Sequence, residues 1–256
     1  MTKFSASSLS MLGGAMAGLK RLDKELGIEI FYEFASEDMW RHILSEAMEG
    51  RTGEFSIHCP FYFADICYSE EEELIRELMV PFDLYHRFDG QFYVLHSHGQ
   101  GKLPEDADER ARLREKVTGR IARLADICEN EGVRLAVENL FGGIGPLFNQ
   151  QQYIELFEQV PKAYALIDVG HALIGNYDIW EVQKALGSRL IGYHIHDNDG
   201  KHDSHRGIYD ENGTADWEKF CQGVRAYTPD ATLVMEYAHA ALSDYKEDMD
   251  RLKGML

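Results

Sequence analysis

The chain has 256 residues, 45% of them hydrophobic, and a formal net charge of −18 at pH 7. Its length and apolar content allow one large core, and its negative charge argues against broad contact with nucleic acid or an anionic membrane. No apolar run reaches the roughly 18 residues of a membrane span, and the four cysteines form no CxxC motif, which fits a reducing cytoplasm. We therefore expect a cytoplasmic protein with a single domain over residues 1–256 and no membrane partner.

Strand-like and helix-like patterns alternate along the whole chain. The predicted strands cover residues 3–7, 28–34, 54–58, 91–96, 133–138, 164–168, 190–196 and 232–237. The predicted helices cover residues 15–26, 38–49, 70–86, 107–131, 150–159, 178–187, 215–226 and 241–253. Eight such pairs are typical of a closed (β/α)8 barrel of ~250 residues. The alternative is an open, doubly wound sheet, but no GxGxxG motif follows the first strand, so we expect no nucleotide cofactor.

Six of the predicted strands carry, at or next to their last residue, a residue type that binds metal ions. These residues are His58, His96, Glu138, Asp168, His196 and Glu236. The ends of parallel strands meet at one mouth of a barrel, so residues distant in sequence converge there. A carboxylate in an apolar strand, such as Glu138 in VRLAVEN, is costly unless it binds a cation or accepts hydrogen bonds. Three such carboxylates together predict a metal site, whereas His58 and His96 could each be a packed core histidine.

The segment HIHDNDGKHDSH holds four of the eleven histidines. His194 and His196 lie two positions apart in a strand and therefore share one face. Only the histidine nearer to the mouth needs to be a ligand, so we assign His196 to the metal and His194 to packing. Asp203 and His205, in the loop that follows, could chelate another ion or belong to a solvated loop, and the sequence leaves both readings open.

These residues make the chain resemble the xylose isomerase-like barrel superfamily, which includes sugar epimerases, inosose-processing enzymes and endonuclease IV. The resemblance is carried by VEN, IDVGH, HIHDND, DSH and the glutamate of the eighth strand, in the expected order. It implies a TIM barrel with a divalent metal. Histidine ligands favour zinc, and a quartet rich in carboxylates suits manganese or magnesium equally. The implied ligands are Glu138, Asp168, His196 and Glu236. After DSH the chain departs from many relatives, because RGIYDENGTADW replaces a stretch rich in proline and glycine.

The resemblance implies an isomerase or epimerase of a sugar, a sugar phosphate or an inosose as the first function. Glu138 and Glu236 would transfer a proton through a metal-stabilised enediolate. His171, the histidine of the DxxH motif, would contact a substrate oxygen, and Arg206 would help to orient the sugar. The expected partner is therefore a small sugar. The outer helices could be solvated or could pair with those of a second copy, so the sequence leaves the oligomeric state open.

An endonuclease IV-like phosphodiester hydrolase with a multinuclear zinc site is the alternative function. The resemblance then implies further metal ligands, namely His58, His96, His171, Asp203 and His205. The net charge of −18 provides no obvious surface for DNA, so we expect that nucleic acid is not the substrate. A barrel that binds a metal or a sugar without catalysis is a third hypothesis, and the dense ligand set argues against it.

Overall fold

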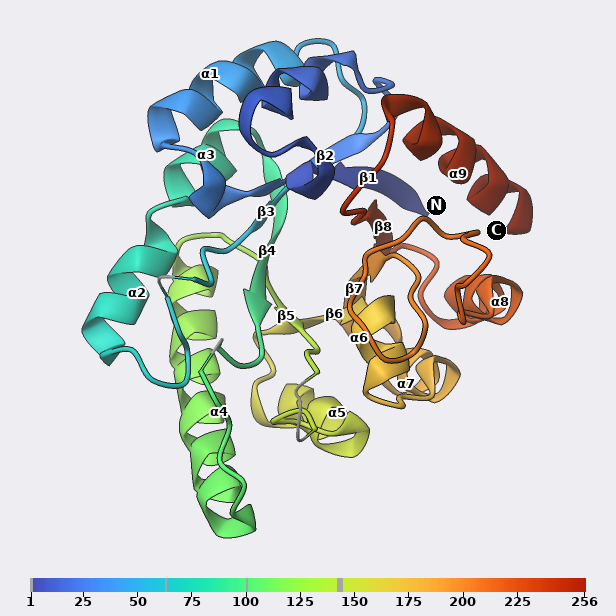
Figure 1. Ribbon diagram of the computed structural model, residues 1–256. Helices are drawn as coiled ribbons and strands as arrows, with labels where there is room; N and C mark the ends of the chain where they lie inside the picture. Colours follow the sequence, from blue (N-terminus) through green and yellow to red (C-terminus); the bar gives the residue numbers. More distant parts are fainter. Residues whose placement is uncertain (1, 63, 100, 142–144) are drawn as a thin grey trace.

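The structure, a computed structural model, describes residues 2–62, 64–99, 101–141 and 145–256. Eight parallel strands form a closed barrel in which each strand pairs with the next and the eighth pairs with the first (Figure 1). The strands are β1 (Lys3–Ser7), β2 (Gly27–Phe31), β3 (Phe55–His58), β4 (Gly90–His96), β5 (Leu135–Glu138), β6 (Tyr164–Asp168), β7 (Leu190–Ile195) and β8 (Thr232–Met235). The prediction of a (β/α)8 TIM barrel is therefore confirmed.

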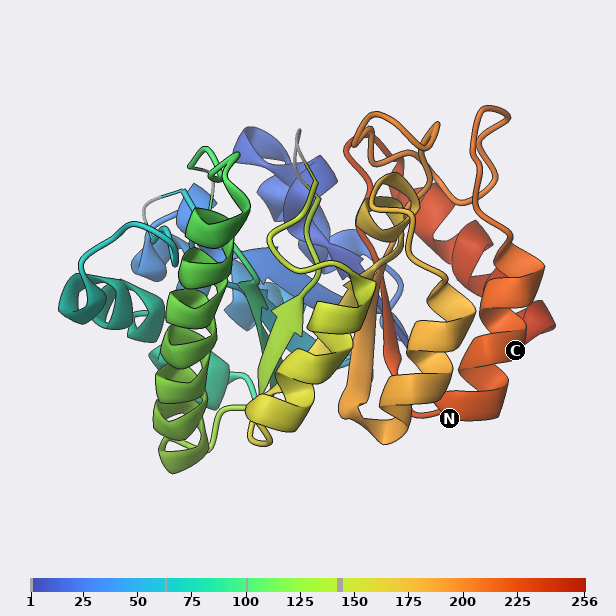
Figure 2. The same cartoon turned by 90° about the horizontal axis from the view of Figure 1, so that it is seen from below.

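Helices surround the barrel, and the loops that follow the strands gather at one end of it (Figure 2). The α-helices are α1 (Glu37–Ala47), α2 (Glu71–Met79), α3 (Phe82–Arg87), α4 (Ala107–Asn130), α5 (Gln150–Gln159), α6 (Val169–Ile174), α7 (Ile179–Leu186), α8 (Trp217–Tyr227) and α9 (Leu242–Met255). Short 3-10 helices lie at η1 (Ser8–Met11), η2 (Gly13–Arg21), η3 (Tyr32–Phe34) and η4 (Gly187–Arg189). Within the described ranges, no helix has the length and apolar character needed to cross a membrane.

Strand alternation carries the predicted ligands into the barrel. A small apolar cluster, separate from the main core, includes Val94, Ala136, Leu166 and Val234 from four strands. The residues two positions further along these strands are His96, Glu138, Asp168 and Glu236. Because side chains two apart in a strand share a face, the apolar cluster and these polar side chains form successive layers of one interior. The polar layer lies toward the carboxyl ends of the strands, where barrel enzymes hold their active sites.

Three predicted elements differ from the structure in ways that local chemistry explains. The predicted helix 15–26 is a 3-10 helix over Gly13–Arg21, a segment whose three glycines disfavour an α-helix. The predicted helix 70–86 is divided into α2 and α3 around Pro81, which has no N–H to continue the ladder. The predicted strand 28–34 ends at Phe31. Beyond this point the carboxylate of Glu33 accepts hydrogen bonds from the backbone N–H groups of Phe61 and Tyr62, in the segment after β3.

Candidate metal centre

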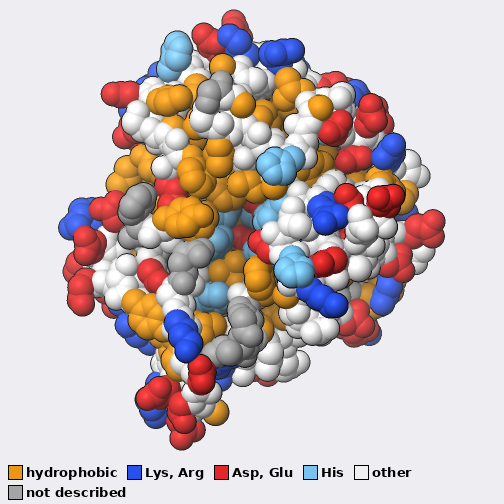
Figure 3. All heavy atoms as spheres, in the orientation of Figure 1, with side chains coloured by type: hydrophobic (Ala, Val, Ile, Leu, Met, Phe, Trp, Pro, Cys, Tyr) orange, Lys and Arg blue, Asp and Glu red, His pale blue; other side chains and the backbone are white. Residues whose placement is uncertain are grey.

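A cavity of about 680 Å³ opens at the mouth of the barrel. Histidine and acidic side chains are visible at its base, and hydrophobic side chains form part of the rim of the opening (Figure 3). The predicted site residues that line it are His58, His96, Glu138, His171, Asp203, His205 and Glu236. Asp168 and His196 are fully buried at 0% exposure and do not line this cavity. The ends of β3, β4 and β5 and the segments after β6, β7 and β8 thus bring these side chains to one place.

The central group consists of three carboxylates around one ring nitrogen. Nδ1 of His194 lies 3.5 Å from Glu138 Oε1, 3.5 Å from Glu236 Oε1 and 3.9 Å from Asp168 Oδ2. His194 Nδ1, Glu138 Oε2 and Glu236 Oε1 are buried without a hydrogen-bond partner among the described residues. Buried polar atoms are rarely left unpaired, and a divalent ion would satisfy these. One imidazole and three carboxylates suit zinc, manganese or magnesium.

The two histidines of the HIH segment lie at different levels of the barrel, with His196 nearer to the mouth, as expected from the sequence. In the β6–β7 register Asp168 pairs with His194, so His194 lies at the level of the carboxylates. His196 lies further along, with its Nε2 3.0 and 3.1 Å from the two carboxylate oxygens of Asp168. Its ring stacks on that of His205 at a centroid distance of 3.9 Å. Nδ1 of His194 therefore lies among all three carboxylates, whereas Nε2 of His196 contacts the carboxylate of Asp168.

A glycine explains how the ring of His196 can occupy this position. A Cβ atom on Gly170, in the IDVGH segment, would overlap with Cε1 of His196. The side-chain amide of Asn198 also donates to the carbonyl of Gly170 at 2.9 Å. The loop after β7 is therefore packed directly onto the start of α6. His196 also lies close enough to His205 and Glu236 for the three to offer ligand atoms within 4.8 Å of one another.

A second group shares Glu138 with the first. The Nε2 atoms of His58 and His96 lie 3.5 and 3.4 Å from Glu138 Oε2. Nδ1 of His58 donates to the carbonyl of Cys59 at 3.0 Å, which directs Nε2 toward the group. The other oxygen of Glu138 faces His194 and also His171, whose Nδ1 lies 3.1 Å away. One carboxylate therefore reaches two groups of candidate ligands.

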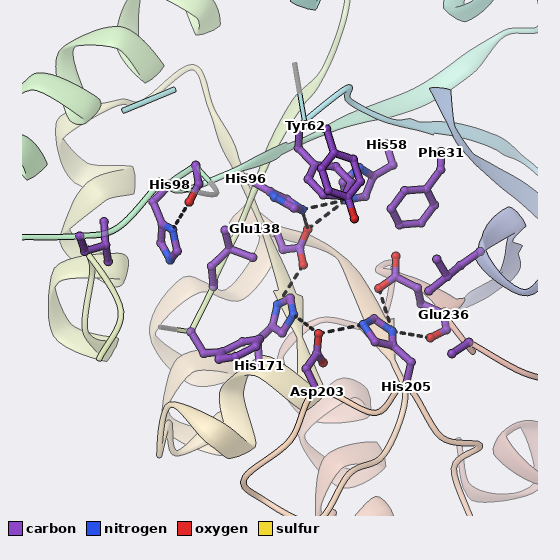
Figure 4. A pocket seen from close by; sticks show the side chains of 18 of the residues that line it. Phe31, His58, Tyr62, His96, His98, Glu138, His171, Asp203, His205 and Glu236 are labelled. Atoms are coloured by element: carbon purple, nitrogen blue, oxygen red, sulfur yellow. Dashed lines mark hydrogen bonds and ion pairs between the residues drawn. The ribbon is translucent and has the colours of Figure 1, made fainter. Parts of the chain in front are cut away.

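A third group lies on the opposite side of the cavity from the His58 and His96 pair (Figure 4). Nε2 of His171 lies 3.4 Å and Nε2 of His205 lies 3.1 Å from Asp203 Oδ2. The Nδ1 atoms of these two rings donate to backbone carbonyls, His171 to Asn139 at 3.0 Å and His205 to Glu236 at 2.8 Å. Asp168 also caps α6 by accepting the backbone N–H of His171 at 2.6 Å. The structure thus brings all five of the further predicted ligands beside the central group.

The two glutamates of the central group have opposite pKa shifts in the ion-free protein. Burial alone would raise the pKa of Glu138, but the charges of His194 and His96 outweigh it and hold the pKa well below its usual range. Burial raises the pKa of Glu236, and the negative charges of Glu138 and Asp168 add to this effect despite the nearby histidines. Glu138 is therefore held ionised, while Glu236 retains a proton more readily.

The predicted substrate residue Arg206 is not brought to the cavity. Its Nη1 lies 2.9 Å from Asp210 Oδ1 and its Nε donates to Ser204, so it braces its own loop. Conversely, sequence reasoning missed Glu29, a buried acid in the apolar strand GIEIF that contacts His194. The signal that identified Glu138, a carboxylate inside an apolar strand, was also present for Glu29.

Comparisons with known proteins agree with this architecture. A model of the xylose isomerase-like TIM barrel family matches residues 24–255. An uncharacterized protein of Methanocaldococcus jannaschii is 24% identical over 208 residues, covering 79% of this chain and 78% of the relative.

Among solved structures, a D-tagatose 3-epimerase-like protein is similar with a TM-score of 0.82 and 19% identity, covering 99% of this chain and 97% of its own. D-allulose 3-epimerase from Methylomonas sp., solved with D-allulose, has a TM-score of 0.75 and 18% identity. The match covers 100% of this chain and 97% of the epimerase chain. A Thermus thermophilus protein soaked with zinc chloride has a TM-score of 0.74 and 19% identity. The match covers 99% of this chain and 98% of the Thermus chain. At these identities the structures establish the fold alone. From the family match, the chain belongs to the xylose isomerase-like TIM barrel family.

Proposed function

We propose that this protein is a divalent-metal-dependent isomerase or epimerase of a sugar, a sugar phosphate or an inosose. The observation that carries the proposal is the central group, in which Glu138 and Glu236 flank His194 Nδ1 at the base of an open cavity. A divalent ion held by Glu138, Asp168, His194 and Glu236 would polarise adjacent carbonyl and hydroxyl oxygens of a sugar. The sugar 3-epimerases with the same fold support this substrate class.

The two glutamates would perform the proton transfer. Glu138, on one side of His194 Nδ1, would accept a proton from a substrate carbon. Glu236, on the other side, would return a proton to the substrate. His171 lines the cavity beside Glu138 and would hydrogen-bond a substrate oxygen. The rings of Phe31 and Phe61 line the same cavity and offer apolar faces to the C–H groups of a sugar.

Solvent exchange tests this proposal. Protein loaded with zinc, manganese or magnesium should introduce deuterium from D₂O into a ketose or inosose, as followed by NMR. Glu138→Gln and Glu236→Gln should each abolish the exchange, because each removes a proton carrier. Glu211→Gln, at an exposed position in the loop after β7, is the matched control and should retain it. A loaded, folded protein that leaves a broad panel of these compounds unexchanged would contradict the proposal.

Metal-dependent hydrolysis of a phosphodiester is the second candidate, and the two further groups favour it. Glu138 faces both the His58 and His96 pair and the central group, as a carboxylate shared between two ions would. Two ions about 3.5–4 Å apart can stabilise the attacking and leaving oxygens of such a reaction. Three zinc ions per chain together with cleavage of abasic DNA or a small phosphodiester would favour this function. One ion per chain and sugar exchange would favour the first.

A further inference from the structure

Glu29 lies beneath the metal centre and connects two sides of the barrel. Its side chain belongs to β2 and is completely buried at 0% exposure. Glu29 Oε1 lies 2.8 Å from Nε2 of His194, which belongs to β7. Glu29 Oε2 accepts a hydrogen bond from the Ser56 hydroxyl at 2.9 Å, and these two residues are partners in the β2–β3 register. Both carboxylate oxygens are therefore engaged, one of them by His194.

His194 differs from three of the other candidate histidine ligands in what holds its ring. His58, His171 and His205 each direct Nδ1 at a backbone carbonyl, so the main chain fixes which nitrogen faces the metal group. His194 is reversed: its Nε2 meets the side chain of Glu29 while Nδ1 faces the three carboxylates. Its orientation therefore depends on a residue that can be replaced by mutation.

This contact determines which nitrogen of His194 faces the metal group. A carboxylate accepts hydrogen bonds, so Nε2 of His194 donates its proton to Glu29 Oε1. Nδ1, the atom that lies among Glu138, Asp168 and Glu236, is then the nitrogen left to bind a metal in place of a proton. Hydrogen bonds from a ligand histidine to a carboxylate fix the ring and increase its basicity toward a metal.

We propose that Glu29 is a positioning residue of the metal centre, which holds His194 with Nδ1 as its ligand atom and is itself held by Ser56. This inference rests on the metal centre of the proposed function, but it does not depend on which substrate the protein uses. Glu29 does not line the cavity, so it would act through His194 rather than on a substrate.

The test compares Glu29→Gln, Glu29→Ala and Ser56→Ala with the parent protein, using Zn²⁺ as the probe. Zinc affinity is measured by competition with a chelator, and bound zinc is counted by elemental analysis. Glu29→Ala should weaken zinc binding roughly 10–100-fold without changing the number of ions per chain. Glu29→Gln should lose less, because its amide oxygen can accept the same proton, and Ser56→Ala should lose least. Asp248→Asn replaces another buried carboxylate, bound to Tyr237, and should keep the parent affinity.

NMR of zinc-loaded protein labelled with ¹⁵N-histidine supplies a readout that general destabilisation would not change. The Nε2–H signal of His194, assigned with His194→Gln, should be present in the parent, shift in Glu29→Gln and be lost to solvent exchange in Glu29→Ala. Parent affinity and an unchanged His194 signal in both folded Glu29 variants would overturn the inference. Loss of a whole zinc equivalent in both would also overturn it, since Glu29 would then be a ligand. Failure of sugar exchange would leave these results unaffected, so the two proposals fail separately.

Discussion

Glu138 is the residue on which both candidate functions depend. Its two oxygens face different neighbours, His194 and His171 on one side and His58 and His96 on the other. With one ion in the central group, the carboxylate would still be free to exchange a proton. With a second ion between His58 and His96, the same carboxylate would be shared by two ions and would no longer act as a base. The number of bound ions therefore determines the chemistry of this residue.

The different places of His194 and His196 give an order of effects on metal binding. His194→Gln should weaken zinc binding more than about 100-fold, because it removes the ring nitrogen among three carboxylates. His196→Gln should weaken it roughly 10–100-fold, because it acts through the orientation of Asp168. Chelator competition on the two purified variants measures both effects. The opposite order would assign the ligand role to His196.

The four cysteines are predicted to be chemically inert in the folded protein. All four are free and buried. Burial raises the pKa of Cys67 and Cys221 to about 11 and that of Cys128 to about 12, and it also raises the pKa of Cys59. The reactive thiolate is therefore almost absent at pH 8. A disulfide reagent should label no thiol of the native protein at pH 8 and four in denaturant. Rapid labelling of the native protein would show that a thiol is accessible.

At the scale of the elements, the sequence predicts which strands carry ligands but not the level along the barrel axis at which each ligand lies. Apolar strands that end on or next to His, Glu or Asp identify the faces of β4, β5, β6 and β8, because alternation has a period of two. The choice between His194 and His196 depends on the stagger of β7 against β6, which pairs Asp168 with His194. Stagger in a barrel is a property of the closed sheet, and no local pattern specifies it. For the same reason the contact between Glu29 and His194, across the barrel, lies beyond sequence reasoning.

The close packing of the start of α6 on the loop after β7 gives a prediction at this scale. Gly170→Ala should destabilise the protein by about 1–3 kcal/mol, because the new Cβ would overlap with the ring of His196. It should also weaken zinc binding, since His196 holds Asp168. Gly119→Ala in α4 is the matched control: its Cβ would meet no atom within 4 Å, and it should stabilise the protein by up to about 1 kcal/mol. Denaturant unfolding measures both changes. Equal effects would mean that the Gly170 contact relaxes at no cost.

At the scale of the whole molecule, the barrel concentrates negative charge on buried side chains near its mouth. Glu29, Glu138, Asp168 and Glu236 are all at most 2% exposed, in a chain whose net charge is already −18. Histidines compensate for part of this charge, and a bound cation would compensate for more. The fold without an ion should therefore carry an electrostatic cost at its mouth, and metal binding should contribute to stability as well as to chemistry.

Glu236 makes that cost measurable, because burial and the charges of Glu138 and Asp168 raise its pKa in the folded state. A carboxyl with a raised folded-state pKa lowers stability as pH rises above its unfolded value of about 4.3, and the full cost is reached above the folded pKa. In EDTA, Glu236→Gln should thus unfold at a higher temperature than the parent at pH 8, and the difference should shrink toward pH 4.

Excess zinc should reverse this order at pH 8. The parent should gain about 2.7 kcal/mol when free zinc is 100 times its dissociation constant, whereas Glu236→Gln, which lacks one ligand, should gain less at the same zinc concentration. Thermal unfolding of both proteins in EDTA and in zinc gives the four values needed. If Glu236→Gln were the less stable protein in EDTA at pH 8, the carboxylate would already be compensated by His194 and His205 without an ion. A crossover between the two conditions would instead mean that Glu236 is retained at a cost to the empty fold because it binds metal.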